Sequence, residues 1–305
     1  MIKKFWHVAC VFLIPLFLGA CDSGQNADGP KYSTMPLREG LPVVRFAVHP
    51  LHNPQKLVES YQPLINLLNQ QQNEVRFVLE ASRDYTKYEE KLRNREPQFL
   101  LPNPWQTLVA IKAGYTVFAM AGTPEDFKGL ILVRKDGDIH KIADLIGKAI
   151  SYPSPTALAA CMMPQMYLLQ HGVNVVEQTQ SRYVGSQESS IMNVYLKQTA
   201  AGATWPPPWR FFQKEHPEEA AQLRVAWETE SMVNNSVMAR NDVPPELVAM
   251  VRRTLLTLQE TPEGREILLG METQAFLPAS NQSYNVVAQF IQEFEKKLRK
   301  VEAAK

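Results

Sequence analysis

The stretch Lys128–Gly137 has the sequence KGLILVRKDG, and Ile142–Ile150, with the sequence IADLIGKAI, follows it after a short gap. The apolar run Leu130–Arg134 predicts a buried strand that ends in a turn with basic and acidic residues. Residues Ile142–Gly147 predict a short helical turn, and Lys148–Tyr152 predict a second strand. This order of elements is typical of an α/β protein.

The same alternation continues on both sides of this stretch. Apolar runs bounded by turn residues predict strands, and apolar residues at helical spacing predict helices between them. The predicted strands are 42–48, 74–79, 99–102, 115–121, 180–184, 203–205, 224–228 and 236–239, and the predicted helices are 55–70, 83–94, 105–113, 156–170, 188–197, 245–257, 263–270 and 283–299. We therefore expect an α/β fold with mostly parallel sheets.

The elements divide into two α/β sets, which predicts two lobes. Lobe I consists of residues 43–134 plus 232–305, and lobe II of residues 135–231, because helices of the first lobe resume after the second set. Each lobe has ~100 residues or somewhat more, an ordinary domain size. Ligands of open α/β sheets bind outside the carboxyl ends of the strands, so two facing lobes form a cleft that can close on a small molecule.

The N-terminus predicts a secretory signal peptide at residues 1–20. Two lysines precede the apolar run Phe5–Ala20, which has no charged side chain. A basic start followed by an apolar run is the pattern of a signal peptide. The run is shorter than the ~20 residues that span a bilayer, which makes a permanent transmembrane helix the weaker alternative.

The tetrapeptide Leu18–Cys21, with the sequence LGAC, resembles the lipobox of bacterial lipoproteins. The resemblance implies cleavage before Cys21 and attachment of lipid to its thiol, and the alternative is a plain signal peptide with a chance cysteine. Asp22 resembles the residue that retains such lipoproteins at the inner membrane. Residues 21–42 lack periodicity and predict a flexible tether. We expect a periplasmic protein held to the inner membrane by lipid.

Composition and charge exclude several classes of protein. The 305 residues are 45% hydrophobic and 21% charged, which is ordinary for a globular protein, and three cysteines are too few for a disulfide framework. A net charge of +1 gives no electrostatic reason to expect nucleic acid. The sequence has no nucleophile elbow, metal signature or phosphate-binding loop, so we expect neither an enzyme nor a cofactor.

Three short motifs carry a resemblance to a known family. They are Asp84-Tyr85 at the start of a helix, the loop Tyr152–Ala157 (YPSPTA) and the turn Gly185–Ser189 (GSQES). Together with the opening stretch, they resemble type II periplasmic solute-binding proteins, and within these the phosphate/phosphite/phosphonate-binding family of ABC importers. The likeness covers roughly 43–278. It implies a two-lobed fold with a ligand cleft and an anion as the ligand.

The sequence also departs from the family pattern. Pro155 and Ala157 alter the first loop, and Gln187 stands where the family has histidine. Aminophosphonate binders carry an acid where this chain reads Asn234-Asn235-Ser236. An anion site survives these changes, with Asn235 as a candidate contact, whereas a site for 2-aminoethylphosphonate does not.

The loop at Ser154 suits an anion for a physical reason. Ser154 is a good N-cap, Pro155 is a good first helical residue, and the following amides from Thr156 onward point out of the helix end unpaired. Such an end carries roughly half a positive charge and holds an oxyanion without lysine or arginine. The hydroxyls of Ser154 and Thr156 add donors. The alternative is a plain helix cap.

Four further side chains are candidate ligand contacts. Ser186 and Gln187 start a second helix in the same lobe, with helix capping as the alternative. Tyr85 supplies a phenol from the opposite lobe, unless it packs on the helix surface. Trp205 begins the segment Trp205–Trp209 (WPPPW), which predicts polyproline II or a turn and an aromatic rim to the cleft, or a packed connector.

Cysteine and histidine offer weaker candidates. Cys161 has apolar neighbours and predicts a buried, inert thiol, with a soft-metalloid or redox contact as the alternative. His49 and His52 follow the first strand, and an ordinary polar loop is favoured over a metal site because no third ligand can be assigned.

These observations favour a binding protein over an enzyme. We expect a receptor that closes on a small oxyanion and delivers it to an inner-membrane permease of an ABC importer. The alternative is a periplasmic receptor that binds the same kind of ligand but signals to a membrane histidine kinase or cyclase. Ligand identity stays open between phosphate-like and phosphonate-like anions.

Overall fold

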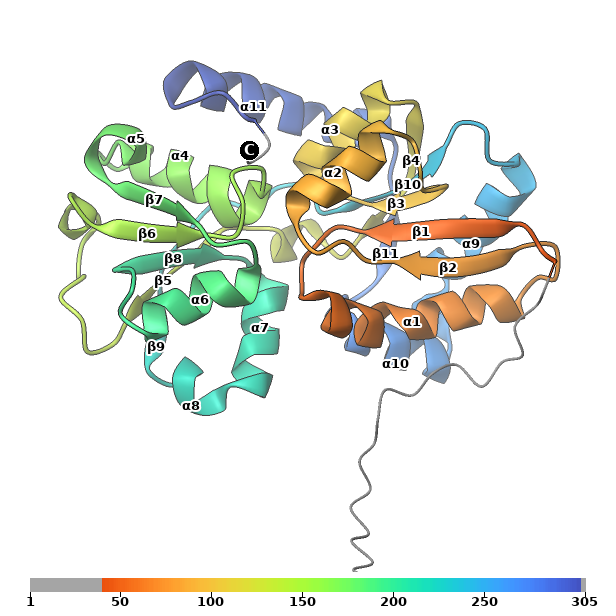
Figure 1. The fold of residues 1–305 in the computed structure, drawn as a ribbon, viewed down its shortest axis with the longest axis horizontal. Coiled ribbons are helices and arrows are strands. Elements are labelled where there is room, and N and C mark those ends of the chain that lie inside the picture. Colours follow the sequence, from red (N-terminus) through yellow and green to blue (C-terminus); the bar gives the residue numbers. More distant parts are fainter. Residues whose placement is uncertain (1–39, 303–305) are drawn as a thin grey trace, which may run out of the picture. The chain divides into compact units, whose positions relative to one another are not determined.

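The computed structural model describes residues 40–302 of this chain, shown in Figure 1. These residues belong to one unit that begins at Arg38. The predicted signal peptide at 1–20, the lipidation site Cys21 and nearly all of the predicted tether lie outside the described residues. Between residues 40 and 302, no helix is both long and apolar enough to cross a bilayer.

The first sheet has six strands in the order β11-β4-β10-β3-β1-β2. Its strands are β1 Val43–Val48, β2 Arg76–Glu80, β3 Phe99–Leu101, β4 Tyr115–Ala121, β10 Ser236–Arg240 and β11 Phe276–Pro278. β1 pairs in parallel with β2 and β3, whereas β10 runs antiparallel to β3 and β4. The strand that returns from the second lobe therefore lies in the middle of the first sheet.

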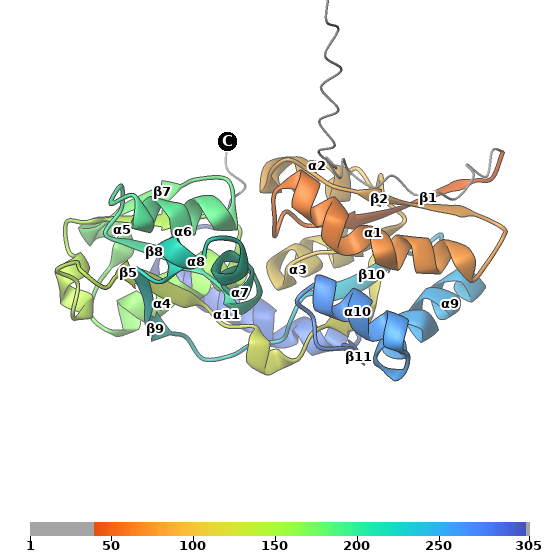
Figure 2. The same cartoon turned by 90° about the horizontal axis from the view of Figure 1, so that it is seen from below.

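Helices cover both faces of this sheet because its strands are apolar on both sides. Phe46 and Val48 face the core made with α1 Pro54–Gln70, α9 Pro245–Leu256 and α10 Pro262–Gly270. Ala47, which lies between them, faces the opposite core. That core contains α2 Tyr85–Arg93, α3 Pro104–Lys112 and α11 Asn285–Lys297. Figure 2 shows the same arrangement from below.

The second sheet has five strands in the order β7-β6-β8-β5-β9. They are β5 Leu130–Arg134, β6 Ala149–Tyr152, β7 Gln180–Tyr183, β8 Ala201–Thr204 and β9 Leu223–Glu228. β5 pairs with β8 and β9, so the sequence analysis was wrong to place residues 130–134 in lobe I. Periodicity predicts that a segment is a strand, but the choice of sheet depends on long-range partners.

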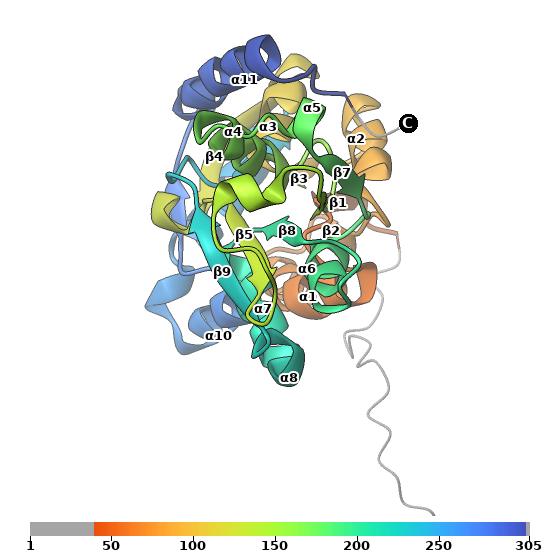
Figure 3. The same cartoon turned by 90° about the vertical axis from the view of Figure 1, so that its left-hand side faces the viewer.

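Helices also cover both faces of the second sheet (Figure 3). α4 Met163–Gln170 and α5 Val175–Gln178 lie on one face, and α6 Gln187–Tyr195, α7 Pro206–Glu215 and α8 Pro217–Ala220 lie on the other. α6 packs closely on β8 at Gly202, where an added Cβ would lie 2.5 Å from the Ser190 carbonyl oxygen. This close packing fixes the start of α6 beside the end of β8.

The structure corrects two predictions about local structure, the first of them only at the start of a helix. The helix expected at 156–170 begins as a π-helical turn at Leu158–Met162 and continues as α4. The segment Pro206–Pro208 is the first turn of α7 rather than polyproline II or a plain turn. All three prolines fit there because the first amides of a helix have no intrahelical acceptor, so their missing N–H groups cost nothing.

Candidate functional site

The loop after β6 forms a compact turn in which both hydroxyl residues are buried. The Thr156 N–H donates to Ser154 Oγ over 3.3 Å, and the two hydroxyl oxygens lie 3.0 Å apart. The helix starts later, with Ala157 in the cap position and no side-chain cap, which corrects the prediction of Ser154 as its N-cap. The Thr156 amide is therefore bonded within the turn and does not point freely from a helix end.

Thr156 also connects the two lobes. Its hydroxyl donates to Glu89 Oε1 on α2 over 2.6 Å. Its carbonyl oxygen accepts from Asn103 Nδ2, at the start of α3, over 3.2 Å. Thr156 is 0% exposed, so these bonds are shielded from water. The predicted anion loop thus contacts lobe I directly.

Glu89 is a functional candidate that the sequence analysis missed. Its side chain is 0% exposed, and besides Thr156 it accepts from Gln106 Nε2 over 3.2 Å and from an Arg93 guanidinium nitrogen over 3.3 Å. Burial raises the pKa of the Glu89 carboxyl, although the bonds from Thr156 and Gln106 oppose the shift. The available signal was its spacing, because a residue four positions after Tyr85 shares its helix face.

Tyr85 and Gln187 form a second bond between the lobes. Gln187 Nε2 donates to the Tyr85 hydroxyl over 3.2 Å, and Gln187 Oε1 accepts from the Thr204 hydroxyl over 3.0 Å. Tyr85 is 4% exposed and Gln187 2%. Burial raises the pKa of Tyr85, so the phenol stays neutral and keeps its proton to donate. Both residues face the junction, as the sequence analysis expected of ligand contacts.

Ser186 lies at the edge of this cluster. It is the N-cap of α6, where its hydroxyl oxygen accepts from the Ser189 N–H over 3.0 Å and its proton goes to Ser189 Oγ over 2.9 Å. Gly185, just before it, has a φ of +87°, a left-handed conformation that favours glycine. The structure thus uses Ser186 as a cap, and its role as a ligand contact stays a prediction.

Trp205 and Asn235 lie together in an adjoining pocket. Both are buried, and they line it with Leu51, Tyr61 and Asp126. Within residues 40–302, Asn235 Oδ1 has no hydrogen-bond partner. This pocket is next to the Tyr85–Gln187 bond, because Trp205 directly follows Thr204, whose hydroxyl donates to Gln187.

The two histidines after β1 are buried. His49 Nδ1–H donates to the Leu101 carbonyl over 3.0 Å, and its ring meets the Tyr85 ring at 6.2 Å between centroids. Burial lowers the pKa of His49 to about 4 and that of His52 to about 3. Both rings are therefore neutral at neutral pH. In the described part of the chain, no three metal-ligating side chains come together.

Cys161 is fully buried, and its Sγ contacts the same Arg299 nitrogen that donates to the Pro155 carbonyl of the Ser154–Thr156 turn. Burial raises the pKa of its thiol to about 12, which fits the inert thiol that its neighbours predict. Arg299, beyond the end of α11, reaches this turn from lobe I. Its guanidinium donates to the Pro155 carbonyl over 2.9 Å and to Gln165 Oε1 over 3.1 Å.

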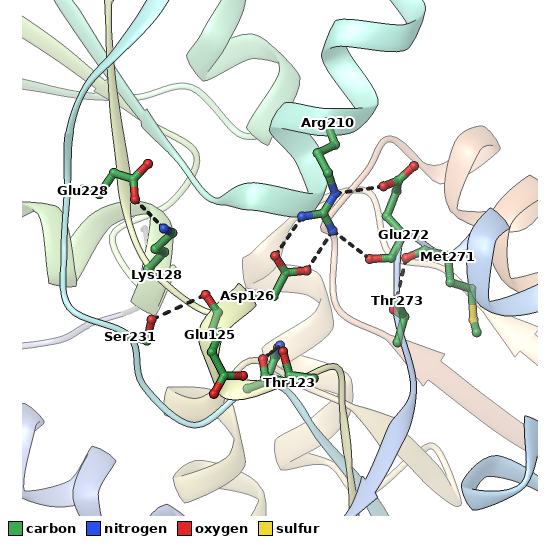
Figure 4. Close-up of polar contacts among 11 residues, drawn as sticks. Thr123, Glu125, Asp126, Lys128, Arg210, Glu228, Ser231, Met271, Glu272 and Thr273 are labelled. Atoms are coloured by element: carbon green, nitrogen blue, oxygen red, sulfur yellow. Dashed lines mark hydrogen bonds and ion pairs between the residues drawn. The ribbon is translucent and has the colours of Figure 1, made fainter. Parts of the chain in front are cut away.

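A group of charged side chains joins the lobes on another side, near the segments that connect the two sheets (Figure 4). Arg210 of α7 donates two bonds of 2.7 Å to Asp126, and a third of 3.0 Å to the Glu272 carboxylate. Lys128, just before β5, pairs with Glu228 at the end of β9, where the two connecting segments leave the second sheet. The ion pairs of Arg210 hold α7 against lobe I.

The whole arrangement has the chemistry of a binding site. Neutral donors from two lobes converge with one carboxylate, and the residues are buried because the lobes are closed on each other. Because these groups are buried in this structure, separation of the lobes would expose them to a ligand. The site can therefore couple ligand capture to a change in lobe position.

Comparison with known proteins relates the chain to transport proteins. A family described as "ABC transporter, phosphonate, periplasmic substrate-binding protein" matches residues 46–284. The phosphate-import protein PhnD of Mycolicibacterium smegmatis is 25% identical over 258 residues, covering 79% of this chain and 77% of the relative.

Two solved structures are similar in fold. The binding component of an ABC phosphonate transporter from Pseudomonas aeruginosa has a TM-score of 0.77 at 17% identity, covering 84% of this chain and 88% of the other. PhnD1 of Prochlorococcus marinus in complex with methylphosphonate has a TM-score of 0.75 at 18% identity, covering 83% and 98%. The predicted type II periplasmic binding protein fold is confirmed. The expectation of mostly parallel sheets was wrong, because both sheets are mixed, with five antiparallel and four parallel strand pairs among the described residues.

Proposed function

This chain belongs to the family of periplasmic substrate-binding proteins of ABC phosphonate transporters, and from that premise we propose that it binds a small oxyanion between its lobes and delivers it to an inner-membrane permease. One observation carries the proposal. The stretches around Tyr85, Thr156 and Gln187, which lie far apart in the sequence, meet where the lobes touch. The family is one of binding proteins, not of enzymes, so closure rather than catalysis is the output.

The bonds of the closed protein indicate how capture proceeds. Opening breaks the Gln187–Tyr85 and Thr156–Glu89 bonds, which frees the two donors of lobe II, while the Tyr85 hydroxyl on lobe I has its own proton to donate. A phosphate-like or phosphonate-like anion then takes these donors, and the lobes close around it. Because the ligand contacts both lobes only when they are closed, it stabilises the closed state relative to the open one.

Membrane attachment forms a second part of the proposal. We infer from the LGAC tetrapeptide that Cys21 carries lipid and holds the protein at the inner membrane. Replacement Cys21→Ser should release the protein from the membrane fraction. Retention of this variant in that fraction would contradict the anchor and leave the proposed ligand binding intact.

A thermal-shift screen of the purified protein tests the ligand class. Phosphate, phosphite, methylphosphonate and sulfate are compared, and a true ligand at 100 times its dissociation constant should stabilise the fold by about 2.7 kcal/mol. Tyr85→Phe should weaken binding about fivefold, since it removes one neutral donor. Tyr195→Phe, on α6 away from the junction, serves as the matched control. No shift with any anion would contradict the proposal.

The same site also fits a sensor, in which the closed receptor signals to a membrane histidine kinase or cyclase. Deletion of the gene distinguishes the two roles. An importer should lose uptake of the labelled ligand, whereas a sensor should keep uptake and lose only the response to it.

A further inference from the structure

The strongest unexplained feature of the junction is its single buried carboxylate. Glu89 lies in contact with Thr156, which the proposed function uses to hold an anion. A buried charge is costly unless it is paired. Its only ion pair in the described chain is with Arg93, whose side chain is 45% exposed and therefore compensates weakly. The carboxylate thus needs hydrogen-bond donors from elsewhere.

The direction of the hydrogen bonds shows what Glu89 requires. The Thr156 N–H donates to Ser154 Oγ, and the Thr156 hydroxyl donates to Glu89 Oε1. An ionised carboxylate is an acceptor only, so one donor of the loop, the Thr156 hydroxyl, is directed at Glu89 in the closed protein. Glu89 occupies the acceptor position that a ligand oxygen would take at this loop.

A bound anion must then coexist with this carboxylate. Like charges at close range repel. If the carboxylate and the anion are both fully ionised, their facing oxygens are both acceptors and no proton lies between them to form a hydrogen bond. A ligand that brings its own donor avoids this conflict, because its proton lies between the two oxygens. Such a ligand replaces Thr156 on Glu89, which frees the Thr156 hydroxyl for a ligand oxygen.

We propose that Glu89 makes the site selective for anions that carry a hydrogen-bond donor, such as the P–OH of a singly protonated phosphonate or an ammonium group, and that it rejects sulfonates without one. The inference rests on the proposed function and assigns its specificity to one residue. Glu89 acts on the ligand directly and not through the stability of the fold.

The pH dependence has a defined sign. The titratable groups that face Glu89 are Arg93, Tyr85 and Tyr88, all on α2, while Thr156 and Gln106 do not titrate. Burial raises the pKa of both phenols, so they stay neutral. Affinity for a phosphonate should therefore fall as rising pH removes the last ligand proton, and affinity for a sulfonate should rise when Glu89 itself becomes protonated at low pH.

Titration calorimetry on the full chain tests the proposal with three probes. Methylphosphonate offers a P–OH, 2-aminoethanesulfonate offers an ammonium group, and methanesulfonate offers neither. The wild type should bind at least one of the first two about tenfold more tightly than methanesulfonate. The probe that binds more tightly shows whether Glu89 accepts from a P–OH or from an ammonium group. Glu89→Gln, whose amide can donate, should abolish this preference, and Glu90→Gln on the exposed side of the same helix should retain it.

The outcomes separate the two proposals. If the wild type binds none of the three probes, the specificity proposed for Glu89 fails, and the proposed function fails with it when no anion of the thermal-shift screen binds either. If the wild type binds methanesulfonate as tightly as the others, or if Glu89→Gln keeps the preference, only the role of Glu89 is overturned. Should Glu89→Gln not fold, wild-type methylphosphonate affinity that stays constant as the pH rises through the second ligand ionisation also overturns it.

Discussion

The lobes meet in two regions of opposite character. The cleft region, made of Tyr85, Glu89, Thr156 and Gln187, is fully buried and joined by hydrogen bonds in which one partner at most is charged. The second region, which we call the hinge region, consists of the ion pairs of Arg210 with Asp126 and Glu272. The side chains are 36%, 15% and 8% exposed, so the region is partly open to solvent. Buried neutral bonds depend on exact partners and little on salt, whereas exposed ion pairs are screened by salt. The first kind suits a specific site, and the second a connection that holds while the lobes move.

The largest expected effect is a loss of stability at low pH, caused by buried histidines next to the cleft region. Unfolded histidine takes up a proton near 6.5, but folded His49 does so only near 4, so stability should fall as the pH drops through this interval. The difference corresponds to on the order of 3 kcal/mol, and His52 adds a contribution of the same sign. Urea unfolding across this range should show the loss, and His49→Gln should reduce it. An equal pH slope in His49→Gln and in the exposed control His140→Gln would contradict the assignment.

The next effect comes from removing a single hydroxyl at the cleft. Thr156→Val keeps the shape of the side chain but leaves the Glu89 carboxylate without its 2.6 Å donor. We expect a loss of about 1–3 kcal/mol in the free energy of unfolding, little changed by salt. Thr179→Val removes a local bond to the Val175 carbonyl and is the matched control. Equal losses in both variants would show that the contact between the lobes has no special weight.

A smaller, salt-dependent effect is expected at the hinge region. Arg210→Lys keeps the charge but loses the paired bonds to Asp126, which need a planar guanidinium. We expect a loss of about 1 kcal/mol at low salt that shrinks at high salt. The opposite result, a loss in Arg210→Lys that does not change with salt and a loss in Thr156→Val that does, would contradict the difference in character between the two regions.

The smallest effect should come from the ion pair between the connecting segments. Lys128 and Glu228 are both substantially exposed, with side chains 29% and 47% accessible. Lys128→Ala should change the free energy of unfolding by no more than about 0.5 kcal/mol. A loss above that of Arg210→Lys in the same unfolding series would show that the connecting segments, and not α7, carry the hinge-side stability.

The fold could be predicted from the sequence, but only part of the candidate site could. Alternating strands and helices predicted two α/β lobes, and the motifs at Tyr85, Thr156 and Gln187 were correctly expected to meet. Glu89 was missed because its one local signal, the spacing of four positions after Tyr85, does not by itself distinguish a buried acid from the solvent-facing acids of an amphipathic helix. Its burial depends on Thr156, 67 positions away in the sequence. The late start of the helix after Ser154 was missed for a similar reason, since side chains from the other lobe hold that turn.

Arg299 gives the end of the chain an unexpected importance. It follows α11 in lobe I, yet its guanidinium donates a hydrogen bond to the Pro155 carbonyl of lobe II. Shortening the protein before Leu298, or fusing a bulky partner close behind Arg299, should therefore disturb recognition at a loop whose own sequence is untouched. A fluorescent reporter for this receptor is better inserted at an exposed turn such as Asp136–Asp138 than attached at the carboxyl end.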